Sequence, residues 1–163
     1  MKEIIFMGPY RHYGDTKFDR SKFQPIKNKN IPGSTKPYGG LWCSLVAFDN
    51  MTWLDWCRDE GFCLDKYEKS NFVLGLLPGT ELLVIDSHAK YMALPKYRDP
   101  ILGIDPLLDY EKLVECGIDA IYVDFESEHA SPELVYDFYG WDVSSLLVLN
   151  PDCVCAEEDN NEK

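Results

Sequence analysis

The chain has 163 residues, of which 45% are hydrophobic, 27% charged and 13% aromatic. This balance is close to that of ordinary globular domains, so it excludes wholesale disorder, and the length suits one domain. The 16 basic and 28 acidic residues leave a net charge of −12. That charge disfavours non-specific binding to nucleic acid or to an anionic membrane, because the long-range field repels both.

From the sequence we expect neither a membrane span nor a secretory leader. No apolar run reaches the roughly 18 residues that a membrane helix needs, and the run near Met1 is too short for a signal peptide. We therefore expect a cytoplasmic protein whose six cysteines are reduced. Cys153 and Cys155 form a lone C-x-C. Because zinc needs a second ligand pair at suitable spacing, we expect no metal site.

The first predicted elements are a short strand and a long basic loop. The apolar run 4–7 predicts the strand. Between Arg11 and Lys36 the chain has seven basic residues against two acidic ones, with little apolar periodicity and two prolines. Such a segment predicts a loop, which is either functional or a solvated basic surface that balances the acidic remainder of the chain.

The middle of the chain predicts a strand, a helix and two further strands, at 41–48, 53–60, 72–77 and 82–85. Thr52 and Asp55 form a capping-box-like start for the helix, and Gly61 ends it. Trp53 and Trp56 fall on one face of this helix, so we expect both to be largely buried.

Pro78-Gly79-Thr80 separates the last two of these strands and predicts a tight or hairpin-like connection. The remaining chain predicts a helix, a strand, a second helix and a final strand, at 107–116, 120–125, 133–139 and 146–149. Asp105-Pro106 and Ser131-Pro132 supply an N-cap and a first-turn proline for the two helices. Residues 155–163 predict a disordered acidic tail.

The order of these elements favours the α+β class. Strands do not alternate regularly with helices, as they would in a doubly wound parallel sheet. We expect one domain over residues 1–154, with a mainly β core of two small sheets and a few flanking helices.

Two segments concentrate residues that can carry chemistry, and no general catalytic or phosphate-binding motif accompanies them. In the first, 36–44, paired glycines precede a strand and Trp42 offers a flat stacking face. In the second, 139–145, Asp142 and two hydroxyls stand at the mouth of an apolar strand. The alternative interpretation is structural: a glycine turn, core tryptophans and an aspartate that caps a turn.

The order of these segments resembles the ADP-ribosyltransferase-like superfamily. Gly40-Leu41-Trp42-Cys43-Ser44 is similar to the second strand of that fold, 117–123 to a strand that often precedes the last element, and 146–151 to the closing strand. More narrowly, K-P-x-G-G-L-W-x-S and Y-G-W-D-x-x-S resemble motifs of small uncharacterised bacterial and phage proteins. The likeness spans residues 36–154.

The resemblance implies an ADP-ribosyltransferase-like fold and NAD as the substrate. It implies catalytic roles for Asp142, Ser44 and Ser144, and it implies that the cofactor-binding residues are Lys36, Gly39, Gly40, Leu41, Trp42 and Trp141. Ser144 stands where the relatives carry the catalytic Glu, so Asp142 is the carboxylate that remains in the motif. Met7 stands where an early strand carries His or Arg, with Arg11 and His12 nearby.

Three hypotheses follow. The protein is an NAD-consuming transferase with a protein or other acceptor, or a degenerate relative that binds NAD or another nucleotide without cleaving it. The third hypothesis is a non-catalytic interaction module whose acidic surface binds a basic protein partner. Stabilisation by NAD separates the first two from the third, and release of nicotinamide separates the first from the second.

Overall fold

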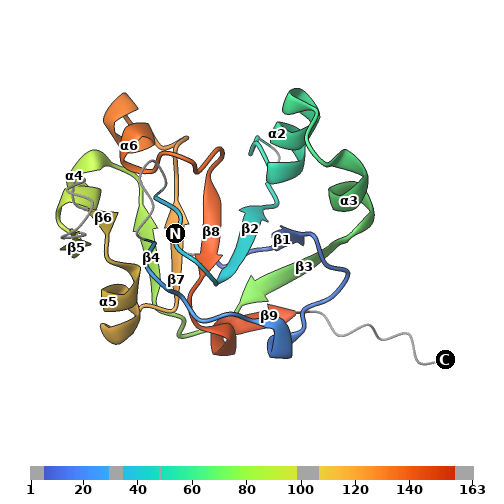
Figure 1. The fold of residues 1–163 in the computed structure, drawn as a ribbon, viewed down its shortest axis with the longest axis horizontal. Helices are drawn as coiled ribbons and strands as arrows, with labels where there is room; N and C mark the ends of the chain where they lie inside the picture. The colour runs from blue at the N-terminus through green and yellow to red at the C-terminus, as the bar shows by residue number, and fades with distance from the viewer. Residues whose placement is uncertain (1–5, 30–34, 48, 99–106, 157–163) are drawn as a thin grey trace.

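The computed structural model describes residues 6–29, 35–47, 49–98 and 107–156, and it has a mixed α+β architecture (Figure 1). The strands within these ranges are β1 (Tyr10–Tyr13), β2 (Leu41–Leu45), β3 (Asn71–Leu76), β4 (Leu82–Ile85), β5 (Lys96–Tyr97), β6 (Leu107–Leu108), β7 (Ala120–Val123), β8 (Ser145–Val148) and β9 (Val154–Ala156). The helices are α2 (Trp53–Glu60), α3 (Leu64–Lys69), α4 (His88–Met92), α5 (Tyr110–Glu115) and α6 (Pro132–Asp137), with short 3-10 turns at Arg20–Lys22 and Pro151–Cys153.

Seven strands form one sheet in the order β4-β7-β8-β2-β1-β3-β9, and β5 pairs with β6 separately. Only β4 and β7 are parallel; the other pairs are antiparallel. The expected pair of small sheets is therefore corrected to one large sheet and one two-stranded sheet. The large sheet changes partner along β2, whose first residues pair with β8 and whose last residues pair with β1.

The core lies on both faces of β7 and β8. Leu146 and Val148 pack with Tyr10 of β1 and Leu74 of β3 in one apolar cluster. Leu147, together with Ile121 and Val123 of β7, packs in a second cluster with residues of α4, α5 and α6. Figure 1 shows these three helices at the left of the view, near β4, β7 and β8, whereas α2 and α3 lie together at the right, near β1, β2 and β3. The residues of β7 and the last three residues of β8 are buried because both faces of these strands are covered.

Several element predictions are confirmed. Strands occur in the expected runs at β2, β3, β4, β7 and β8, although β2 and β7 are shorter than predicted. Thr52 and Asp55 form the complete capping box of α2, and Gly61 ends this helix in the left-handed conformation at φ +66°. Pro132 lies in the first turn of α6, after Ser131 as N-cap.

Other element predictions are wrong in ways that matter for the site. The expected basic loop begins with β1, which is inserted between β2 and β3. Of the predicted strand 4–7, Phe6 and Met7 lie in a turn, and the rest falls outside the described residues. Pro78 and Gly79 form the expected tight turn, but β3 and β4 do not pair as a hairpin, because they lie in separate parts of the sheet. The short helices α3 and α4 were not expected.

Two boundaries also move. The helix predicted at 107–116 begins at Tyr110, because Asp109 is its N-cap and Leu107–Leu108 forms β6. The proposed cap Asp105-Pro106 lies outside the described residues. At the C-terminus, β9 pairs with β3 up to Ala156, two residues beyond the predicted domain limit. Residues 157–163 of the predicted tail lie outside the described part of the chain.

In the described ranges no helix combines the length and the apolar character that crossing a membrane requires.

Candidate functional site

A cleft of about 280 Å³ opens between β2 and the segment that leads into β8. Its wall contains aromatic rings from five parts of the chain, one lysine, one carboxylate and two serines. The described residues that line it are His12, Tyr13, Lys36, Trp42, Cys43, Ser44, Trp53, Tyr67, Trp141, Asp142, Val143 and Ser145. Five of the nine residues singled out from the sequence are therefore together here: Lys36, Trp42, Ser44, Trp141 and Asp142.

Strand pairing explains how residues about a hundred positions apart meet. β2 and β8 are antiparallel neighbours, with Trp42 opposite Leu147 and Cys43 opposite Leu146. The end of β2 therefore lies beside the start of β8, and the turn that carries Asp142 enters the sheet next to Ser44. The two segments singled out from the sequence are therefore adjacent in the structure.

Aromatic rings form most of the cleft wall. Trp42 and Trp141 make an edge-to-face contact across the β2–β8 seam, with ring centroids 4.6 Å apart. Trp53 stacks on Trp56 within α2 at 4.8 Å, and its edge meets Tyr67 of α3 at 5.9 Å. Trp53 and Trp56 are half-buried, not largely buried as predicted, because they pack on each other and Trp53 faces the cleft; Cys57 takes the buried position of the helix.

One ion pair crosses the cleft. The Nζ atom of Lys36 lies 3.8 Å from Oδ2 of Asp142, and each side chain is 32% exposed. The same Nζ atom is 5.6 Å from the ring centroids of both Trp42 and Trp53. Burial lowers the pKa of Lys36, and attraction to Asp142 opposes that shift. The lysine is thus a partly dehydrated cation, held by one carboxylate and two indole faces.

The backbone around Lys36 is fastened to the opposite wall. The N–H and the hydroxyl of Thr35 both donate to the carbonyl of Tyr139, at 3.3 and 2.9 Å. The hydroxyl of Tyr110 donates to the carbonyl of Thr35 at 2.8 Å. Tyr139 is only three residues before Asp142, so the two charged residues are presented by segments that are hydrogen-bonded to each other.

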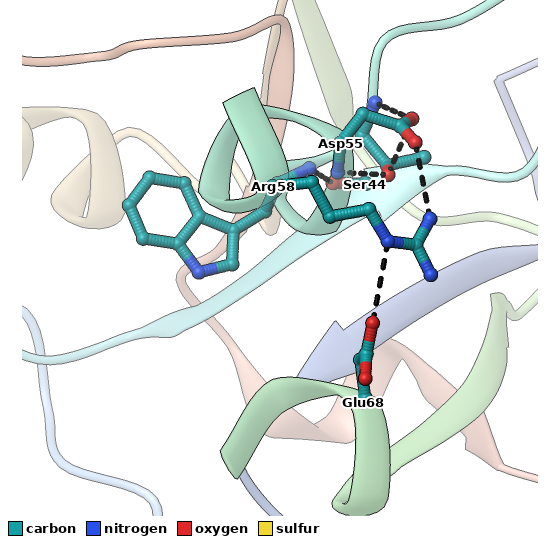
Figure 2. A network of polar contacts seen from close by, with 6 residues as sticks. Ser44, Asp55, Arg58 and Glu68 are labelled. Atoms are coloured by element: carbon teal, nitrogen blue, oxygen red, sulfur yellow. Dashed lines mark hydrogen bonds and ion pairs between the residues drawn. The ribbon is translucent and has the colours of Figure 1, made fainter. Parts of the chain in front are cut away.

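Ser44 connects the sheet to the other wall. It is 1% exposed, and its Oγ atom accepts a hydrogen bond of 2.9 Å from the N–H of Trp53, the first residue of α2. Figure 2 shows this contact beside Asp55, which completes the capping box, and Arg58, which lies between Asp55 and Glu68. Hydrogen bonds from Thr52 to Asp55 lower the pKa of that carboxyl. Ser44 therefore positions the helix that carries Trp53.

His12 is a cleft residue that the sequence prediction did not include in the site. It lies on β1, and its Nδ1 atom is 2.7 Å from the carbonyl oxygen of Trp42. The neighbouring Arg11 pairs with Ser44 in the β1–β2 register. The first strand therefore carries basic residues and lies beside β2, which carries Ser44. This first strand is Tyr10–Tyr13 and not the predicted strand 4–7. The alternation of Tyr10 and His12 with polar neighbours was the available signal for it.

Four of the nine predicted residues are not in the cleft lining. Ser144 is 3% exposed, and its Oγ atom accepts a hydrogen bond of 2.9 Å from the N–H of Phe125. Gly39 and Gly40 have φ of +77° and +73°, and a Cβ atom on Gly40 would lie 2.5 Å from Leu147. Gly40 also donates its N–H to the carbonyl of Gln24. The glycines permit a close approach within the chain itself.

A second, smaller cavity of about 140 Å³ adjoins the cleft through His12, which lines both. Gly40 and Leu41 line this cavity together with Lys17 and Lys22 of the basic segment. Lys22 lies 3.6 Å from Asp15, so part of the positive charge is already balanced. Asp15 and Asp19 also line this cavity, so its two lysines face two carboxylates, and His12 lies between it and the aromatic cleft.

Comparisons with known proteins add no family assignment. No protein-family model matches the chain, and neither does any curated protein or solved structure. Among the described residues, no group of three or more His, Cys, Asp or Glu side chains is placed to hold a metal ion. The site is defined by its own geometry: an aromatic cleft with one cation and one anion at its mouth.

Proposed function

We propose that the cleft binds the nicotinamide-ribose end of NAD and that the protein cleaves the bond between nicotinamide and ribose. It would act as an ADP-ribosyltransferase or NAD glycohydrolase. The observation that carries this proposal is the meeting of Trp42, Trp141 and Asp142 at the β2–β8 seam. Indole faces suit the flat, positively charged nicotinamide ring, and a carboxylate beside them suits the positive charge that develops on the ribose.

The size of the cleft favours part of the dinucleotide over the whole. Pockets that enclose a drug-sized ligand measure roughly 300–1,000 Å³, and this one is at the lower limit with about 280 Å³. It suits one ring and its sugar. The pyrophosphate and adenosine would lie outside, toward Lys36 at the mouth or toward the cavity that contains Lys17 and Lys22.

The reaction breaks the bond between the ribose C1′ atom and the nicotinamide nitrogen. The bonding pair leaves with the nitrogen, which gives neutral nicotinamide and an oxocarbenium-like ribose. The acceptor, a nucleophile or water, then bonds to C1′ and loses a proton. Asp142 would accept a hydrogen bond from a ribose hydroxyl and stabilise the cation; Ser44 would act indirectly, by holding α2 and Trp53 against the ligand.

A second candidate is binding of NAD without cleavage. It is favoured by the position of Ser144, which replaces the expected catalytic Glu and is buried against Phe125. Asp142 is the one carboxylate among the described residues of the cleft. A site with a single carboxylate, already paired with Lys36, retains the binding surface and has less charge available for the transition state.

The test is release of nicotinamide by wild type, Asp142→Asn and a control, Asp152→Asn. Asp152 is an exposed carboxylate that pairs with Arg20 and does not line the cleft. We expect Asp142→Asn to lower the rate by about 10²- to 10³-fold, as for loss of one transition-state contact, while the control keeps the wild-type rate. Equal rates for the two variants would contradict the role of Asp142.

Thermal unfolding with NAD tests whether NAD binds at all, because a ligand that binds the folded state raises the Tm, and release of nicotinamide then separates the two candidates. A raised Tm without nicotinamide release supports binding alone. No change in Tm and no release would overturn both candidates.

A further inference from the structure

Lys36 occupies the part of the cleft where a bound cation would make its best contacts. Its ammonium group is equidistant from the ring centroids of Trp42 and Trp53, at 5.6 Å, and is 3.8 Å from Asp142. Cations within about 6 Å of a ring centroid are attracted by the aromatic face. The indoles and the carboxylate together therefore form a site for a positive charge.

The ion pair between Lys36 and Asp142 already occupies this cation site and neutralises its carboxylate. Lys36 is the single lysine or arginine among the described residues of the lining, and Asp142 is the single carboxylate. A ligand cation that approached the indoles would meet a like charge, and it would find the carboxylate already paired. Such a ligand binds well only after the ammonium has moved.

Lys36 has the means to move while its backbone stays in place. Hydrogen bonds of Thr35 to Tyr139 and Tyr110 hold the backbone in place, so the four-carbon side chain of Lys36 can change rotamer without a backbone movement. The side chain is 32% exposed, so water borders one side of it. Burial lowers the pKa of Lys36, which indicates that part of its hydration is lost in the cleft and is recovered outside.

We propose that the ammonium of Lys36 is a built-in occupant of an organic-cation site and that the charged nicotinamide ring of NAD displaces it. This inference rests on the proposed function. The nicotinamide ring takes over the contacts with Trp42, Trp53 and Asp142, and the displaced ammonium pairs with the pyrophosphate at the cleft mouth. Each positive charge keeps a negative partner, so the cleft selects a ligand that carries both a cationic ring and an anionic linker.

The displacement predicts opposite effects of one substitution on two fragments of NAD. Lys36→Met keeps most of the stem and removes the charge. We expect it to bind 1-methylnicotinamide, a permanent cation, about tenfold more tightly than wild type does, because a tethered competitor is gone. It should bind ADP-ribose, the anionic fragment, several-fold more weakly, and neutral nicotinamide within about twofold of wild type.

Binding is measured by quenching of tryptophan fluorescence, since three indoles line the cleft, and by calorimetry. Lys36→Arg keeps the charge and should behave as wild type toward both fragments. Lys112→Met is the matched control: this lysine pairs with Glu115 on α5 and does not line the cleft. It should change neither affinity.

The outcomes separate this inference from the proposed function. If wild type binds NAD but Lys36→Met binds 1-methylnicotinamide no more tightly, the displacement is wrong and the proposed function stands. If Lys36→Met gains affinity for the cation while no variant binds NAD or ADP-ribose, the organic-cation site stands and the proposed function is wrong. A gain for neutral nicotinamide equal to that for the cation would also overturn the inference, because relief of crowding would explain both.

Discussion

The two walls of the cleft are built in different ways. Trp141, on the wall that leads into β8, is 4% exposed and packs in the larger apolar cluster with Phe138, at a ring distance of 5.1 Å. Trp53, on the α2 wall, is half-buried and stacks on its own helix. Its helix is attached to the sheet by the hydrogen bond to Ser44 and to α3 by the ion pair between Arg58 and Glu68 (Figure 2).

Because of this difference, we expect substitutions in the two walls to affect protein stability and ligand binding to different extents. A wall that is part of the core cannot be changed without loss of buried contacts, so its substitutions act on both properties. A wall attached by a few polar contacts can move or lose a ring at lower cost, so its substitutions act mainly on the ligand. Elements that adjust on binding tend to come from such regions of few buried apolar contacts.

The largest expected effect comes from truncating the two tryptophans in turn. Trp141→Ala should lower the free energy of unfolding by about 3–5 kcal/mol, as for other buried aromatic residues. Trp53→Ala should lower it by about 1–2 kcal/mol, because a half-buried ring loses less contact. Urea denaturation measures both. Equal losses would remove the contrast between the walls.

An intermediate effect is expected at the joint between the α2 wall and the sheet. Ser44→Ala leaves the N–H of Trp53 without its acceptor, which should cost about 1 kcal/mol of stability. Because Ser44 positions the helix, the affinity for NAD should fall as well. Ser144→Ala is the matched comparison: it removes the same kind of hydrogen bond, to Phe125, outside the cleft. It should lower stability equally and leave the affinity unchanged.

The smallest effect is expected at the outer contact of the same wall. Arg58 is 52% exposed and pairs with Glu68 at 3.3 Å. Exposed ion pairs contribute about 0–1 kcal/mol, so Arg58→Gln should change the unfolding free energy by less than ~0.5 kcal/mol. A loss above ~1 kcal/mol in urea denaturation at low salt would mean that the α2–α3 contact depends on this pair.

Local signals in the sequence were sufficient where one short segment determines its own structure. The capping box at Thr52 and the left-handed Gly61 delimit α2 without help from elsewhere, because both act through hydrogen bonds or backbone freedom within a few residues. The apolar run of β7 was recognisable because its four buried residues are consecutive in the sequence. The short helices α3 and α4 were missed, since five or six residues carry too little periodicity to be seen.

The candidate site was predictable in part. The concentration of Trp42, Ser44 and Asp142 in two dense segments indicated a site, and the structure brings these residues into one cleft. His12 was noted in the sequence but not assigned to the site, because β1 is short and mostly polar and its strand character depends on pairing with β2 and β3 on both sides.

By itself, the sequence determined the α+β class, the ends of α2 and the two segments that meet at the cleft. Those features depend on propensity, capping and apolar runs, which act over short distances along the chain. Only the tertiary structure decided that seven strands form one sheet, that Ser144 points to the interior and Ser145 to the cleft, and that Lys36 lies on the indoles. These outcomes depend on strand order and register, and a shift of one residue in register exchanges the two faces of a strand.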